Sequence, residues 1–357
     1  MKVPEGLKRV VFAMEPTANY HKSLGEHLIR CGHQVVLVSG AAAHENRKTL
    51  DGRWDTNDPR DAANVADLVS QGKCLFYEFP VGALQDLRNL LSLKRRFKRV
   101  EHGYRVRIRN HLLAKYFPEL DRYYDQSPST SLAIVRWCLD PSVIAGLEYK
   151  QFVQRVGSGQ RRLSQENRLP AIWKMAVDSV GCEVGPAVEF EAQVMGEGLK
   201  QIQEAIQAIE EKIHEACSQF PEYEFLLSIP GFGPDVSAKV LGAIGDPFRF
   251  QNGRQVLKMA GLELSAERSG KTSQSVIPVI SKKGKADLRY ALYQAAFIAS
   301  IRNQDFIVYY THKLRGRERE PGIKTKMRVK LSAKLLTMAW TLMKKKEPFN
   351  PDYLNLE

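Results

Sequence analysis

The hydrophobic positions near the N-terminus follow first a strand-like and then a helical period. Short runs rich in β-branched residues, at 8–13 and 33–39, predict two buried strands. Helical spacing over residues 20–31 predicts a helix between them, and a second helix is expected to begin near residue 58, after a polar loop. The order strand, helix, strand, loop, helix is typical of a parallel α/β layer.

Beyond residue 80 the pattern changes to long apolar stripes with helical spacing. Basic residues fill the gaps between the apolar positions of 84–108, which predicts an amphipathic helix. The proline-free stretch 190–220 carries a narrow apolar seam and predicts a second long helix. We expect the two helices to pack antiparallel as a coiled-coil arm. Residues 118–190, interrupted by prolines, are expected to be mostly helical.

A compact α-rich domain is expected from Tyr223, and it contains the turn IPGFGP at 229–234. This turn is similar to that of a helix-hairpin-helix, in which glycines and the next helix N-terminus offer backbone N–H groups to a phosphate. Gly231 and Gly233 are therefore candidate phosphate contacts, and an ordinary turn between two helices is the alternative. A basic helical tail is expected beyond about residue 310.

The 357 residues carry a formal net charge of +13, and the positive charge is concentrated in two segments. There are ten Lys or Arg and one Glu from Arg88 to Lys115, and twelve Lys or Arg and two Glu from Lys313 to Lys346. Such clusters favour a polyanionic partner over solubility alone, and we expect nucleic acid. The candidate phosphate contacts of the first segment are Arg88, Lys94, Arg95, Arg96, Lys98, Arg99, Arg105, Arg107 and Arg109.

Composition argues against several other classes of protein. No run of about 18 apolar residues is present, so no membrane span is expected, and the N-terminus lacks the apolar core of a signal peptide. The five cysteines are far apart and include no CxxC pair. This pattern argues against a zinc site or a disulfide framework and favours a cytoplasmic location.

Three carboxylates near the N-terminus are candidates for chemistry. Glu15 follows the first strand, and Asp58 and Asp61 are three apart in a first helical turn, where they share one face. Three clustered carboxylates repel one another unless a divalent cation joins them, and Mg²⁺ is the usual ion in phosphoryl-transfer sites. The alternative is that each aspartate only complements the helix dipole.

A second candidate site lies in residues 260–292, which are rich in serine, glycine and lysine. Ser269 has Arg268 and Lys271 nearby, and these cations could stabilise phosphate oxygens. A serine is a weak nucleophile unless a base or a metal activates it, so a polar loop with a basic surface is the alternative. Two further candidate phosphate contacts follow, Lys282 and Lys283.

Six sequence blocks in a fixed order carry a family resemblance. They are VVFAMEPTANYHKSLGEHL, TNDPRDA, LRNLLSLKRRFKRVEHGYRVRIRNHL, IPGFGPDVSAKVLGAIGDPFRF, AGLELSAERSGK and ISKKGKADLRYAL. As a set they resemble the DEDD transposases of bacterial insertion sequences, whose recombination is guided by a bridge RNA. The resemblance implies an RNase H-like N-terminal domain, similar to Holliday-junction resolvases, and a C-terminal serine that becomes joined to DNA.

The resemblance also assigns roles to particular residues. Glu15 matches the glutamate of the Asp-Glu-Asp-Asp tetrad, Asp58 and Asp61 match its last two aspartates, and Ser269 matches the nucleophile. It implies Mg²⁺ as cofactor, and as partners the DNA of element ends and target, a guide RNA and a second copy of the chain in a dimer or tetramer. The family's first aspartate lies several dozen residues before the glutamate, so the strand that carries it is expected to be missing.

The expected fold class is α/β plus α, in four parts. Residues 1–80 form a truncated RNase H-like domain, and 81–220 a coiled-coil arm with an RNA- or DNA-binding helix. Residues 221–310 form a transposase domain with the helix-hairpin-helix-like turn and the serine, and 311–357 the basic tail.

The expected function is an RNA-guided transposase that excises and inserts an insertion sequence. Two alternatives stay open: a metal-dependent junction nuclease, and a protein that binds nucleic acid without cleaving it. A trapped protein–DNA adduct would distinguish the transposase from both alternatives.

Overall fold

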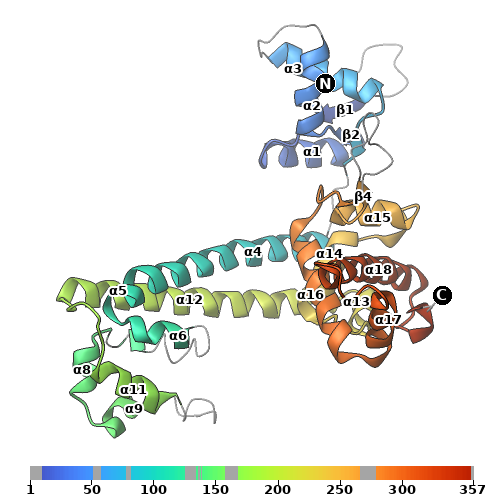
Figure 1. Ribbon diagram of the computed structural model, residues 1–357. Helices are drawn as coiled ribbons and strands as arrows, with labels where there is room; N and C mark the ends of the chain where they lie inside the picture. Colours follow the sequence, from blue (N-terminus) through green and yellow to red (C-terminus); the bar gives the residue numbers. More distant parts are fainter. Residues whose placement is uncertain are drawn as a thin grey trace. The chain divides into compact units, whose positions relative to one another are not determined.

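The computed structural model describes residues 10–50, 58–77, 82–124, 134–135, 137, 139–156, 168–265 and 279–354 (Figure 1). The chain divides into two compact units, Met1–Gly82 and Ala83–Glu357. No helix of the described residues is long and apolar enough to cross a membrane.

The first unit is built on a small sheet with strand order β1-β2-β3. Strands β1 (Val11–Met14) and β2 (Gln34–Leu37) are parallel, and β3 (Leu75–Phe76) is antiparallel to β2. Helix α1 (Tyr20–Arg30) connects the two parallel strands. The strand–helix–strand order predicted from the hydrophobic pattern is therefore confirmed.

The polar segment after β2 was expected to be a loop, but most of it forms helix α2 (Gly40–Leu50), which precedes α3 (Asp58–Ser70). The two helices meet through polar side chains. Buried Asn64 donates to the carbonyl of Ala43 (2.8 Å) and accepts from Asn46 (2.9 Å). Because hydrogen bonds replace much of the apolar contact, α2 has no clear apolar stripe to reveal it.

Two long helices, α4 (Ala83–Arg107) and α12 (Pro186–Cys217), form an arm in the second unit. Figure 1 shows them side by side and running in opposite directions, as predicted. The far end of the arm has its own apolar core, which includes Phe117, Phe152 and Leu199. The elements there are η1 (Ile108–Leu113), α5 (Ala114–Tyr116), η2 (Pro118–Leu120), α6 (Asp121–Tyr124), α8 (Pro141–Ala145), α9 (Tyr149–Val156) and α11 (Leu169–Val177).

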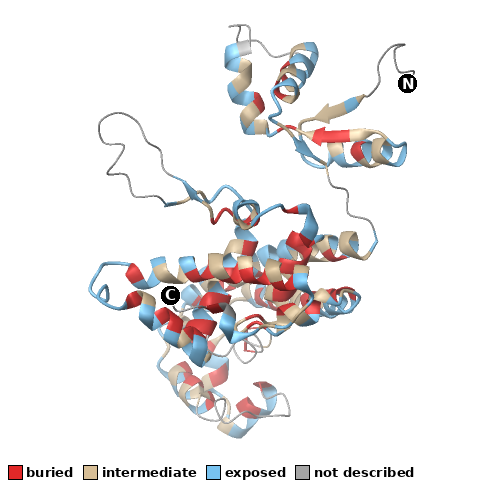
Figure 2. Cartoon of the chain, turned by 90° about the vertical axis from the view of Figure 1, so that its right-hand side faces the viewer, coloured by how far each residue is buried: buried red, intermediate tan, exposed pale blue. Residues whose placement is uncertain are grey.

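The other end of the arm joins a helical head with a larger core, whose buried residues are red in Figure 2. Residues expected as a basic tail contribute to this core, since Leu331, Leu335 and Leu342 are fully buried in it. The elements of the head are α13 (Glu222–Leu227), α14 (Pro234–Ile244), η3 (Pro247–Arg249), α15 (Gly253–Ala260), β4 (Leu264–Ser265), β5 (Val279–Ile280), α16 (Ala286–Arg302), α17 (Gln304–Leu314), α18 (Ile323–Lys345) and η5 (Pro351–Leu354).

The turn between α13 and α14 brings its backbone against α16. Gly231 has φ +89°, and a Cβ there would collide with the carbonyl oxygen of Ala295 and lie 3.2 Å from the Cβ of Ala299. Gly233 has φ −94° and open space around its Cα. The first glycine therefore serves packing, and only Gly233 has room beside it for a ligand.

We expect Gly231→Ala to lower the free energy of unfolding of the second unit by about 2–4 kcal/mol, because the new Cβ adds steric overlap to an unfavourable φ. Gly233→Ala is the matched control and should leave stability within about 0.5 kcal/mol of the original protein. Urea denaturation followed by circular dichroism measures both. Equal stability of the two variants would contradict the packing role of Gly231.

Candidate functional site

Glu15 lies directly after β1, where the sequence placed it, and its side chain turns to the first residue of α2. Its Oε1 lies 2.7 Å from the position that a Cβ would take at Gly40. A carboxylate beside a helix N-terminus is stabilised by the helix dipole and by unpaired N–H groups. The glycine leaves room for Glu15, so α2 itself offers this carboxylate a favourable place.

Asp58 and Asp61 both lie in the first turn of α3, and Asp61 has a cationic partner from α2. The Nη2 of Arg47 lies 2.7 Å from the Oδ1 of Asp61. Their side chains are 30% and 43% exposed, so this ion pair is partly screened by solvent. The buried Nε of Arg47 has no hydrogen-bond partner among the residues that the structure describes. Sequence reasoning missed Arg47, since nothing in the pattern linked the expected loop to Asp61.

In the described conformation Glu15, Asp58 and Asp61 are not gathered into one three-ligand group. The part of the chain that the structure describes contains no group of three or more His, Cys, Asp or Glu that could hold a metal ion. Carboxylate oxygens are suitable donors for Mg²⁺. Here, however, Arg47 supplies the positive charge beside Asp61, and Glu15 turns to α2. The arrangement as described does not fit a three-carboxylate Mg²⁺ site.

Arg268, Ser269 and Lys271 lie outside the described residues. The strands on either side of this segment pair antiparallel, with Leu264 opposite Ile280 and Ser265 opposite Val279. The described residues that flank this segment, Ser265 and Val279, therefore lie side by side. Lys282 and Lys283 follow β5 and are exposed.

Most of the cations predicted to contact nucleic acid along α4 are paired within the chain. Two cations of α4 bind neighbouring elements, Arg88 to the carbonyl of Gly242 (2.7 Å) and Arg95 to Asp287 (3.0 Å), and Arg109 of η1 pairs with Asp121 of α6 (2.6 Å). All three side chains are therefore engaged within the chain in this conformation.

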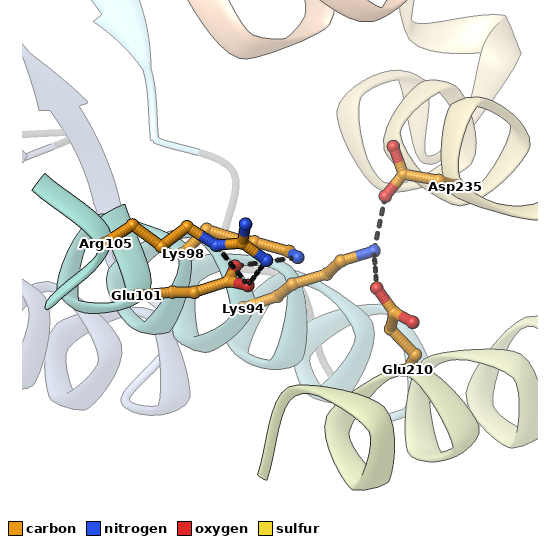
Figure 3. A network of polar contacts seen from close by, with 6 residues as sticks. All are labelled: Lys94, Lys98, Glu101, Arg105, Glu210 and Asp235. Atoms are coloured by element: carbon orange, nitrogen blue, oxygen red, sulfur yellow. Dashed lines mark hydrogen bonds and ion pairs between the residues drawn. The ribbon is translucent and has the colours of Figure 1, made fainter. Parts of the chain in front are cut away.

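Two more of these cations surround Glu101, which is buried on α4. Lys98 lies 3.0 Å and Arg105 3.2 Å from its carboxylate (Figure 3). Burial alone would raise the pKa of Glu101, but the hydrogen bonds and charges of the two cations outweigh it, and the pKa is lowered. Glu101 is therefore ionised and neutralises part of the basic helix.

Lys94 is the sixth paired cation, and it joins three helices (Figure 3). Its Nζ lies 2.8 Å from Glu210 of α12 and 2.6 Å from Asp235 of α14, and Asp235 also accepts from Lys239 (2.6 Å). Burial disfavours the charge on Lys94, whose side chain is 13% exposed, but the two carboxylates outweigh burial and raise its pKa. For Asp235, burial raises the pKa, yet the bonds from Lys239 and Lys94 lower it overall.

Three arginines of α4 remain available. Arg96, Arg99 and Arg107 are exposed, and none of them has an ion-pair partner among the described residues. At about 100° per residue they fall within about 80° of one another around the helix, and they span about 16 Å along it. The candidate nucleic-acid interface of the arm is therefore this face of α4, which we call the arginine face.

Comparison with known proteins gives two family matches and two relatives. Residues 223–311 match a model described as "Transposase IS116/IS110/IS902 family", and residues 3–118 match a second transposase model, that of the DEDD transposases of IS110. A pilin gene-inverting protein of Moraxella bovis is 28% identical over 125 residues, which cover 35% of this chain and 38% of the relative. Its counterpart in Moraxella lacunata is 25% identical over 151 residues, which cover 41% of this chain and 46% of the relative. Each match thus spans less than half of the relative's length.

We expect Asp235→Asn to lower the free energy of unfolding by about 1 kcal/mol at pH 6, because it weakens the bond that Lys94 and Lys239 make to this carboxylate. The pKa of Asp235 is lowered on folding from its ordinary 3.8, so its contribution is present above that pH and is lost as the pH falls below it. The difference between variant and original should therefore shrink at pH 3.

Urea denaturation at pH 6 and pH 3 measures this difference. Glu320→Gln, which removes the carboxylate of an exposed pair with Arg317, is the control and should change little at either pH. A difference for Asp235→Asn that is equal at both pH values would show that its charge does not stabilise the fold.

Proposed function

The chain belongs to the IS110/IS116/IS902 family of transposases, and from this we propose that it cuts and rejoins the DNA of an insertion sequence. The observation that carries the proposal is the order of the two family matches, residues 3–118 followed by 223–311, along one chain. The pilin gene-inverting relatives support DNA recombination as the general reaction.

The arginine face supports a contact to nucleic-acid backbone. Its three guanidinium groups are exposed and unpaired among the described residues, so they can approach phosphates at little desolvation cost. Phosphate contacts supply affinity and position but do not select a sequence. Such contacts leave the choice of sequence to base pairing, in keeping with the guide RNA that the family resemblance implies.

The covalent step that we propose uses Ser269. Its hydroxyl oxygen attacks a backbone phosphorus, a new serine–phosphate ester forms, and the bond from phosphorus to the departing deoxyribose oxygen breaks. The hydroxyl proton passes to a base, and the departing oxygen takes up a proton. Attack on the ester by a deoxyribose hydroxyl of another strand reverses these changes and rejoins the DNA.

Mg²⁺ binding by Glu15, Asp58 and Asp61 stays a prediction from the family resemblance. In the described conformation Asp61 is paired with Arg47, so a metal ion could bind there only after this pair opens. A homo-oligomer is proposed as the working form on the same resemblance.

One observation favours a second candidate function. Arg47 pairs with Asp61, one of the predicted metal ligands, and this fits a protein that binds nucleic acid without cutting it. Such a protein would use the arginine face but would form no covalent adduct with DNA.

We expect Ser269→Ala and Asp61→Ala each to reduce recombination of a marked element in cells by at least about 1000-fold. Ser269→Ala should also remove the covalent protein–DNA adduct trapped by denaturation in detergent. Ser265→Ala is the matched control and should recombine normally. An adduct that persists in Ser269→Ala would rule out this serine and direct attention to Ser265. No adduct from the unaltered protein would favour the second candidate.

The arginine face is tested by Arg96→Gln/Arg99→Gln. We expect the slope of log affinity against log salt for duplex DNA to fall in magnitude by about 1.8, because each lost phosphate contact contributes about 0.9. Lys200→Gln/Lys212→Gln, which removes two exposed cations of α12 that are paired with glutamates, is the matched control. Fluorescence anisotropy at several salt concentrations measures both slopes. Equal slopes for the two double variants would contradict the assignment.

A further inference from the structure

Lys282 has a backbone conformation that side-chain-bearing residues rarely adopt. Its φ is +56°, and the other non-glycine residues with positive φ in the described part of the chain are Ala18 and Lys346. Lys346 directly follows α18, where a left-handed residue is a common way to end a helix. Lys282 ends no helix, so its conformation needs another explanation.

The backbone of Lys282 is held on both sides. Its N–H donates to the carbonyl of Gly261 (3.0 Å), and its own carbonyl accepts from the N–H of Gly284 (3.1 Å) and from Nη1 of Arg289 (3.4 Å). The two glycines lie so close together that a Cβ on Gly284 would collide with the N–H of Gly261. The turn over residues 281–285 is therefore clamped onto the C-terminal end of α15.

The side chain of Lys282, in contrast, has no such restraint. It is exposed, and no carboxylate, carbonyl or aromatic ring within the described residues contacts its ammonium group. The same holds for the side chain of Lys283. The backbone hydrogen bonds therefore fix the point at which the Lys282 side chain projects from the head. The positive charge of this side chain remains available to a partner.

An ordinary structural role does not explain a lysine at this position. Glycine adopts φ near +60° without a steric penalty, and asparagine tolerates it, so either would form the same turn at lower conformational cost. Strained backbone is retained where it serves a function. What lysine adds over those residues is a long side chain with a positive charge.

We propose that Lys282 is a phosphate-binding residue, which the clamped turn holds in position to contact a backbone phosphodiester of the bound nucleic acid. The inference rests on the proposed function, since it requires a polyanionic substrate. It adds that the backbone at this contact is fixed in advance, so that ordering of the turn costs nothing on binding. Lys282 closely follows β5, which pairs with β4, and Ser269 lies between these two strands in the sequence.

Lys282→Gly removes one lysine from a left-handed position, and Lys212→Gln, which removes one lysine of α12 that is paired with Glu215, is the control for the loss of one positive charge. Lys282→Gly should keep the Tm of the original protein or raise it by up to about 3 °C, since strain is relieved, and Lys212→Gln should leave the Tm unchanged. Only Lys282→Gly should weaken binding, by about fivefold at 0.1 M salt, and lower the salt slope by about 0.9. Lys282→Arg should retain binding.

The probes are a fluorescent DNA duplex and a fluorescent RNA hairpin, titrated with the full chain at several salt concentrations. A loss confined to one probe would identify which nucleic acid Lys282 contacts. Original affinity and slope in Lys282→Gly on both probes would overturn the inference and leave the proposed function standing. An unaltered protein that binds neither probe would overturn both.

Discussion

The second unit depends on the two ion pairs of Lys94, because they join the two helices of the arm to each other and to the head. One ammonium group, 13% exposed, meets Glu210 of α12 and Asp235 of α14 at 2.8 and 2.6 Å. Removing a lysine from water is unfavourable unless charged partners surround it, so the pair of carboxylates sets the register at which the helices meet. The close approach of Gly198 on α12 to the Tyr104 ring on α4 fixes the same register further along the arm.

Ion pairing within the chain also decides which cations of α4 are available to a partner. Glu101 and Asp287 neutralise part of the charge of α4, as do the Lys94 partners, and Asp121 pairs with Arg109 of η1. The cations left over are Arg96, Arg99 and Arg107, the arginine face. Charge clustering in the sequence therefore overstates the number of cations that are available to a partner, because most of the basic residues of α4 are paired within the described chain.

The hydrophobic pattern was sufficient for the parallel strands, for α1 and for the long helices of the arm, because each buries a regular apolar stripe. It failed for α2, whose contacts to α3 run through Asn46 and Asn64. The candidate site was less predictable. That Glu15 turns to α2 and that Arg47 meets Asp61 both follow from the position of a helix that the pattern did not show. The i,i+4 pair of Asp235 and Lys239 was visible in the sequence, but its third member, Lys94, depends on tertiary structure.

The left-handed backbone conformation has a different physical cause at each of three positions in this chain. At Gly231 the carbonyl of Ala295 excludes any side chain, so glycine is required and the conformation is a consequence of packing. At Lys346 a helix ends, and many residues would serve. At Lys282 a side chain has room, the backbone is clamped, and glycine would be less strained. Strain that packing does not demand and that a smaller residue would relieve points to the side chain itself, and here the side chain carries a positive charge close after β5.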